Sequence, residues 1–172
     1  MCAKEMGASF GCRWLGLLLC CWLGLVSTAQ ADDDIFSPML TLRMGERVIK
    51  LEREQIAALP QAKLVTSTTL DPRPVTWEGP LVRDVLTLLG ISPEQVVPIR
   101  MESWDDYRVD LTNEDFSRWD VILAWRADGK DLTVENLGPL RVTYPRDQHE
   151  ELQDQRLDHR WVWMLRSITV LP

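Results

Sequence analysis

An arginine preceded by two glycines and a proline is the most specific chemical signal in the chain. The stretch ADGKDLTVENLGPLRVTYP places Gly129, Gly138 and Pro139 ahead of Arg141, which lies in a β-prone run. Glycine lets other groups approach the backbone closely, and a guanidinium can bind phosphate or carboxylate through two parallel hydrogen bonds. The pattern predicts either an anion site at Arg141 or a structural ion pair there.

A second group of polar side chains lies in a Pro-rich loop that precedes a predicted helix. The stretch LVTSTTLDPRP carries the hydroxyls of Thr66, Ser67 and Thr68. Loops held between regular elements often carry binding or catalytic residues. This loop contains no Cys, no His and no Ser with an adjacent base, so it lacks the parts of an activated nucleophile.

Two further clusters could carry chemistry. His149 and His159 are the only histidines, and their spacing of ten does not match helical metal ligands three or four residues apart. A solvated acidic loop is the preferred interpretation. Glu102, Asp105 and Asp106 could supply the acid and base of a glycosidase, but so local a cluster is more typical of a turn.

Tryptophans are frequent after residue 31. We interpret them chiefly as core residues, with ligand stacking in a cleft as the alternative. Trp161 and Trp163 alternate with Val162, which predicts a strand with one aromatic face. The full set comprises Trp77, Trp104, Trp119, Trp125, Trp161 and Trp163.

Residues 1–31 have the pattern of a secretory signal peptide. Lys4 and Arg13 precede an apolar run at 14–26, and AQA at 29–31 is a small-x-small cleavage site. We expect cleavage after Ala31, a periplasmic location and no stable membrane insertion afterwards. An uncleaved anchor is the alternative, although a spanning helix needs about 20 apolar residues.

Removal of this segment also removes every cysteine, because the four lie at Cys2, Cys12, Cys20 and Cys21. Residues 32–172 then form one domain without thiols, which its core alone must stabilise.

The acidic charge balance restricts the partners. Residues 1–31 contain two basic residues and one acidic residue, so their removal changes the formal charge from −7 to −8. A surface of this sign repels nucleic acid and anionic lipid. We therefore expect no nucleic-acid partner; basic partners are favoured, and simple solubility is the alternative explanation.

Short strands and short helices without strict alternation predict an α+β fold. We expect a hairpin over 39–51, a short helix before Pro60, a strand at 63–69 and a helix at 81–89 that Gly90 ends. Strands are also expected at 97–102 and 107–111, a short helix capped by Thr112 or Asn113, and a hairpin turn at Asp128-Gly129. Two strands follow, separated by a charged, mobile segment at 146–159.

Four segments in this order resemble the molybdopterin-binding domain of sulfite-oxidase-type oxidoreductases, most closely its small, secreted, single-domain bacterial branch. They are TWEGPLVRDVLTLLGI, SWDDYRVDL, VILAWRADGKDLTVENLGPLRVTYP and WVWMLRSITV, and the resemblance spans roughly residues 38–171. It implies a mixed β-sheet with barrel-like strands and short helices. It also implies that molybdopterin is the possible cofactor, with candidate contacts at Thr66, Ser67, Thr68, Tyr107, Gly129, Gly138, Pro139 and Arg141.

The chain departs from this family at two places. Catalytic members bind molybdenum through a cysteine thiolate, where this chain has Thr66 to Thr69, and a neutral hydroxyl is a poorer ligand for a soft metal. The family's basic, Gly-rich loop is replaced by RDQHEELQDQRLDH, whose carboxylates repel a phosphate. We therefore expect no catalytic residue, no metal ligand and no bound cofactor.

These departures favour a non-catalytic module that binds a small ligand or an envelope protein. A molybdopterin-dependent oxidoreductase with a non-cysteine metal sphere is the alternative, and a structural interaction protein is a third class.

Overall fold

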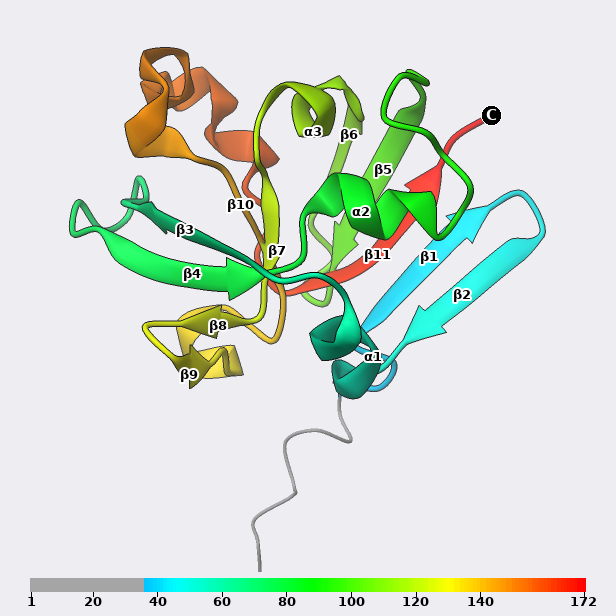
Figure 1. Cartoon of the computed structure of the whole chain (residues 1–172), viewed down its shortest axis with the longest axis horizontal. Coiled ribbons are helices and arrows are strands. Elements are labelled where there is room, and N and C mark those ends of the chain that lie inside the picture. The colour runs from blue at the N-terminus through cyan, green and yellow to red at the C-terminus, as the bar shows by residue number, and fades with distance from the viewer. Residues whose placement is uncertain (1–35) are drawn as a thin grey trace, which may run out of the picture.

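The computed structural model describes residues 36–172, so the predicted signal peptide lies outside the described residues. The strands form a five-stranded sheet, a four-stranded sheet and a two-stranded ribbon (Figure 1). The strands are β1 Leu40–Met44, β2 Arg47–Leu51, β3 Ala62–Thr66, β4 Val75–Gly79, β5 Pro98–Ser103, β6 Arg108–Thr112, β7 Ile122–Ala124, β8 Arg126–Ala127, β9 Lys130–Asp131, β10 Arg141–Thr143 and β11 Leu165–Val170. The helices are α1 Arg53–Ala58, α2 Val82–Thr87 and α3 Glu114–Arg118, with 3₁₀ turns η2 Val134–Asn136, η3 Arg146–Gln148, η4 Glu150–Gln153 and η5 Gln155–Arg160.

The five-stranded sheet carries the larger part of the core. Its order is β2-β1-β11-β5-β6, and β1 runs parallel to β11 while the other pairs are antiparallel. Alternation along β1 buries Leu40 and Leu42 on one face. Helix α2 lies across this sheet in Figure 1 and buries Val82, Val85 and Leu86. Burial of these apolar side chains is the main stabilising contribution.

The other strands build a smaller unit beside it. Strands β3, β4, β8 and β9 form one sheet, and β7 pairs with β10. A second apolar cluster joins them, containing Leu64, Trp77, Ile122, Ala124 and Leu132. In Figure 1 the β3–β4 hairpin projects from the molecule, with η3 to η5 on one side and the β8–β9 hairpin on the other.

Local sequence signals located both predicted hairpins. The 39–51 hairpin is β1–β2, and Gly45 supplies its turn at φ +56°. Asp128 and Gly129 turn between β8 and β9 at φ 48° and 75°, values that suit a tight hairpin.

Some details of the predicted elements differ in the structure. The segment 146–159, predicted only as charged and mobile, contains the 3₁₀ turns η3, η4 and most of η5, and its Leu152 is buried. Asn113 occupies the N-cap position of α3, one of the two predicted positions, but its side chain makes no cap hydrogen bond. Asn113 Oδ1 accepts from Val97 N instead, and Asn113 Nδ2 donates to Gln95 O. The terminal strand begins only at Leu165, because Met164 adopts φ 51°, so Trp161 and Trp163 do not form one face of a strand.

The α+β class, the mixed sheet and the short helices are confirmed, in a single domain. The strands of residues 36–172 do not close into a barrel. Within this same range, the helices are too short and too polar to cross a membrane.

Candidate functional site

Arg141 lies at the centre of the candidate site and is almost completely buried. The residue is 5% exposed, and its side chain makes no hydrogen bond or ion pair with any residue of 36–172. Instead, the guanidinium carbon lies 4.5 Å from the ring centre of Trp77 and 5.6 Å from that of Trp163. Burial lowers the pKa of Arg141 to about 10, so the side chain remains charged at neutral pH. Of the two sequence interpretations, the structural ion pair is therefore wrong.

The backbone hydrogen bonds of β10 explain why Arg141 lies beside Trp163. On one side β10 pairs with β7, where Arg141 lies opposite Ala124 of the smaller cluster. On the other side Val142 N donates to Val162 O, and Leu165 N donates to Leu140 O, each at 2.9 Å. These bonds hold Trp163 beside Arg141.

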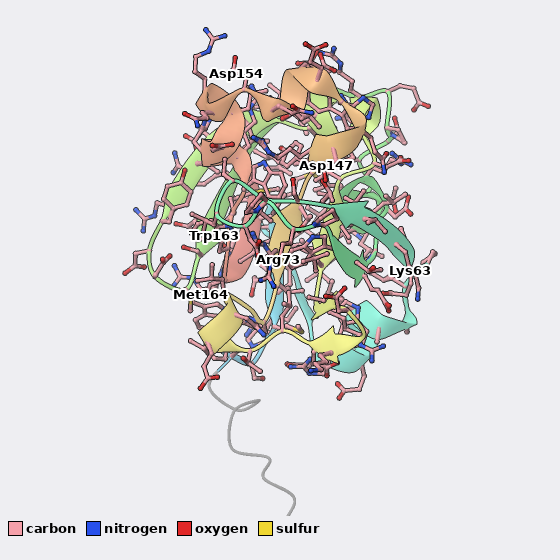
Figure 2. The ribbon with its side chains drawn as sticks, turned by 90° about the vertical axis from the view of Figure 1, so that its left-hand side faces the viewer. Lys63, Arg73, Asp147, Asp154, Trp163 and Met164 are labelled. Carbon is pink, nitrogen blue, oxygen red and sulfur yellow. The ribbon has the colours of Figure 1, made fainter. Side chains whose placement is uncertain are left out.

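The loop that carries Thr66, Ser67 and Thr68, here called the hydroxyl loop, is connected to Arg141 through Trp77. Trp77 Nε1 donates to Thr66 O at 3.2 Å, and Thr66 is fully buried at the end of β3. Figure 2 looks onto this end of the molecule, with Asp147, Arg73 and Trp163 on the same face. The structure thus brings two predicted residues to one indole ring, with Thr66 O at its N–H edge and Arg141 over its face.

A carboxylate binds the next residue of this loop. Asp147 accepts hydrogen bonds from Ser67 N at 2.7 Å and from Ser67 Oγ at 2.6 Å. Asp147 N also donates to Thr66 Oγ1 at 3.1 Å. We call this set of three hydrogen bonds the Ser67–Asp147 clasp. It joins the loop after β3 to η3.

The third predicted hydroxyl supports the loop itself. Thr68 Oγ1 accepts from Asp71 N at 3.0 Å, and Thr68 N donates to Asp71 O at 2.9 Å. The Asp71 side chain pairs with Arg73, whose hydrogen bonds lower the pKa of Asp71 to about 2. Thr68 therefore holds the turn in shape.

Two residues with buried donors lie near Arg141, Thr143 along the chain and Trp163 in space; the sequence reasoning missed Thr143 and treated Trp163 only as a core or stacking residue. Thr143 is fully buried two positions along β10, on the same face of the strand, and its Oγ1 has no partner. Trp163 Nε1 and Arg141 Nε are also buried without partners. The alternation of β10 was the available signal for Thr143, since i and i+2 share a face.

The predicted glycines and proline lie around the site with different roles. A Cβ on Gly138 would lie 2.6 Å from Leu132 Cβ, which confirms the predicted close approach there. Pro139 follows it and leads directly into β10. Gly129 has open space around its Cβ position and is needed for positive φ, so its predicted close approach is wrong. It lies in the β8–β9 turn, which Asp128 fixes to Thr76 of β4.

Tyr107, which was also predicted as a site residue, contacts η5 instead of the Arg141 region. It is 42% exposed in the turn between β5 and β6, and its hydroxyl donates to His159 O of η5 at 2.7 Å. No contact of this side chain with Arg141 or the hydroxyl loop is found in residues 36–172.

The remaining sequence candidates do not assemble a metal site. In the part of the chain that the structure describes, no three His, Cys, Asp or Glu side chains are grouped to hold a metal ion. The Asp105 carboxylate accepts from Ser103 Oγ and Tyr107 N, as expected for a turn.

A separate cavity of about 670 Å³ lies between α3, the 93–96 loop and η4–η5. Two ion pairs cross it, Arg118 with Glu151 and Arg160 with Asp115. Of the residues singled out in the sequence, only Trp119 lines it, and the predicted cofactor contacts do not.

The donors near the hydroxyl loop do not fit a thiolate-bound metal. Residues 36–172 contain no cysteine. The loop presents only hydroxyl oxygens, those of Thr66, Ser67 and Thr68, and each of them is already hydrogen-bonded. The Asp147 carboxylate, which binds Ser67, could supply a further oxygen. Soft metals prefer thiolate to such oxygens. The residues present therefore do not suit the metal of the cofactor. The guanidinium of Arg141, which has no hydrogen bond or ion pair in residues 36–172, does not argue against the rest of the cofactor.

This fold and site define a class of proteins, and comparison with known proteins identifies it. A solved structure with this fold is the sulfane dehydrogenase SoxCD from Paracoccus pantotrophus, with a TM-score of 0.57 and 16% identity. The match covers 76% of this chain and 37% of that chain, so this chain spans little more than a third of the length of the chain it matches. The comparison with curated proteins finds no match.

The family is shown by sequence. The oxidoreductase molybdopterin binding domain matches residues 52–148, which is more than half of the chain. The chain belongs to this family. The resemblance drawn from its motifs is thereby confirmed.

Proposed function

We propose that this protein is a periplasmic binding module of the molybdopterin-binding family that performs no molybdenum chemistry. Its site comprises the hydroxyl loop, Trp77 and Arg141, and its partner is a small ligand or an envelope protein.

The observation that carries this proposal is the composition of the hydroxyl loop. Where catalytic relatives place a thiolate, this chain has Thr66 to Thr69, and the Ser67–Asp147 clasp binds the loop to η3. A metal that entered here would have to break hydrogen bonds to a carboxylate. The fold is kept while the metal ligand is replaced by an internal contact.

The route of export gives separate support. The predicted signal peptide contains one arginine, Arg13, whereas export of folded proteins uses a twin-arginine signal. General secretion transports unfolded chains, which cannot carry a cofactor inserted inside the cell.

Family membership favours a second candidate, a molybdopterin-dependent oxidoreductase without a cysteine ligand. In that case the oxygens of Thr66, Ser67 or Asp147 would complete the metal sphere, and the clasp would open.

Metal analysis of the mature protein separates the two candidates. The protein is purified from the periplasm of a molybdenum-replete host, and molybdenum content and pterin fluorescence are measured on the same sample. A cysteine-containing molybdopterin enzyme from the same host is the positive control. We expect neither signal; near-stoichiometric molybdenum and pterin would establish the oxidoreductase instead.

A further inference from the structure

The β1–β2 hairpin carries a charge opposite to that of the chain as a whole. Residues 32–172 have a formal charge of −8, whereas the hairpin contains Arg43, Arg47 and Lys50 against Glu46 alone, a balance of +2. Arg47 is bound within the fold, since it donates to two carbonyls just after α2, at 3.2 and 2.9 Å. For Arg43 and Lys50, by contrast, no hydrogen bond or ion pair is found in residues 36–172, and both side chains are exposed.

These two cations lie on one face of the hairpin together with an exposed apolar side chain. Residues directly opposite each other in an antiparallel pair share a face, and so do residues i and i+2 of one strand. Arg43 lies directly opposite Val48, and Lys50 is two positions further along β2. All three therefore share the face turned away from the buried Leu42, and Val48 is 50% exposed there. We call these three residues the basic face of the hairpin.

Strand β2 is also an edge of the five-stranded sheet. Within residues 36–172 it pairs with β1 alone, and Figure 1 shows its outer side at the margin of the molecule. Every second amide and carbonyl of an antiparallel strand points away from its partner strand. The outer side of β2 therefore offers backbone donors and acceptors to solvent, and such an edge can accept a further strand from another chain.

We propose that β2 is a docking edge for an extended acidic segment of another protein, which adds to the sheet as an additional strand. Its backbone pairs with the outer groups of β2, an apolar side chain lies beside Val48, and a carboxylate lies beside Lys50. Neighbouring side chains on one face of adjacent strands contact each other in this way. Arg43 lies one strand further, about 10 Å from the added strand, and its long side chain adds attraction.

This inference goes beyond the proposed function, because it involves neither the hydroxyl loop nor Arg141. In Figure 1 the β1–β2 hairpin and the β3–β4 hairpin lie on opposite sides of the molecule.

The charge of the hairpin disfavours a second copy of this chain as the occupant. Pairing of β2 with the same strand of another copy would bring two basic faces side by side, and like charges on adjacent strands destabilise the pair. Exposed lysines also protect edge strands from pairing. That role for Lys50 predicts that no segment binds, so a binding experiment separates it from docking.

The test is an NMR titration of the isotope-labelled mature protein with two synthetic peptides of about eight residues, a usual strand length. One peptide alternates glutamate and valine, and the other has lysine in place of glutamate. We expect the glutamate peptide to shift the amide signals of β2 saturably and to slow hydrogen exchange at its outward-pointing amides, which become hydrogen-bonded. The lysine peptide should cause neither change, because like charges repel.

Lys50→Glu tests the charge of the docking edge. We expect the dissociation constant of the glutamate peptide to rise by about tenfold, since repulsion replaces attraction at an exposed site. Lys130→Glu is the matched control, because Lys130 is exposed on β9, the edge strand of the four-stranded sheet, and the two variants carry the same net charge. Neither lysine forms an ion pair in residues 36–172, so both variants should keep the melting temperature of the wild type.

Several results would overturn the docking edge. If Lys50→Glu and Lys130→Glu weaken binding equally, only the net charge matters. Equal binding of both peptides or shifts confined to other strands would contradict it as well, and no shift at all would leave Lys50 as protection of the edge. Signals of β2 that change with protein concentration, without peptide, would show pairing with a second copy instead. None of these results bears on the proposed function, which the molybdenum and pterin measurements test separately.

Discussion

At the scale of single residues, Ser67 and Asp147 join the hydroxyl loop to η3. They come from segments 80 residues apart, and two of their hydrogen bonds end on one carboxylate. Hydrogen bonds to an ionised acceptor are stronger than neutral ones, although the exposure of these atoms to water reduces the gain. The clasp therefore stabilises the loop by a modest amount.

Asp147→Asn tests this contribution. The amide can keep both contacts, with its oxygen accepting from Ser67 N and its NH₂ donating to Ser67 Oγ, but the acceptor loses its charge, so the hydrogen bonds weaken. We expect the free energy of unfolding to fall by about 1 kcal/mol, measured by urea denaturation. Glu150→Gln is the matched control, because Glu150 is exposed two residues from η3 and no hydrogen bond of its side chain is found in residues 36–172. Equal losses in both variants would contradict a role for the clasp.

At the scale of elements, the sequence predicted those features that depend only on neighbouring residues, such as the hairpin turns. Gly45 and Asp128-Gly129 identified their turns because positive φ is a local requirement. The absence of a partner for Arg141 could not be predicted, since it depends on which side chains the fold brings near β10. The same is true of Trp163, where the backbone at Met164 interrupts an apparently regular strand pattern.

Segment 146–159 shows the limit of charge patterns. Its density of charged residues suggested a mobile loop, yet Glu151 of this segment accepts from Arg118 of α3 and from Trp119 Nε1. The residues that flank the segment are bonded to α3 as well. Arg160 forms two hydrogen bonds with Asp115 of α3, and Tyr144, just after β10, donates to the same carboxylate at 3.0 Å. The pairing of these charges with distant residues cannot be seen in sequence order.

Tyr144→Phe tests this connection between elements through its pH dependence. Burial, followed by the Asp115 charge, raises the pKa of Tyr144 well above its usual value. As pH rises past roughly 10, the unfolded tyrosine loses its proton while the folded one keeps it, so the wild type is progressively destabilised. Phenylalanine has no such proton.

We therefore expect Tyr144→Phe to be less stable by about 1 kcal/mol at pH 7, from the lost hydrogen bond. The difference in unfolding free energy should shrink above about pH 10. Arg141 has the opposite effect: burial lowers its pKa to about 10 in the folded state, so stability rises as pH increases above about 10. Both proteins contain Arg141, so this effect cancels in the difference between them. A difference that stays constant up to pH 11 would contradict a buried, protonated Tyr144.

At the scale of the whole molecule, the two apolar clusters meet where β4 passes β7. Leu123 N donates to Pro80 O at 2.8 Å, and Leu81 forms a bridge with Ile122. Gly79 makes this approach possible, because a Cβ there would lie 2.0 Å from Leu123 O, a backbone atom. This contact also sets the distance between Trp77 on β4 and Arg141 on β10, which pairs with β7.

Gly79→Ala should therefore affect both the stability of the domain and the arginine site. Because the obstructing atom belongs to the backbone, β4 must move away from β7, and we expect a loss of about 3 kcal/mol in urea denaturation. Gly129→Ala is the control: its Cβ position is open, and only the left-handed backbone opposes alanine, at about 1 kcal/mol. At a temperature where both variants remain folded, Gly79→Ala should also change the tryptophan fluorescence, because Trp77 on β4 moves relative to Arg141, while Gly129→Ala leaves it unchanged. Similar losses in the two variants would mean that the junction of β4 and β7 adapts freely, and that Trp77 is not held against Arg141 by the packing of the two clusters.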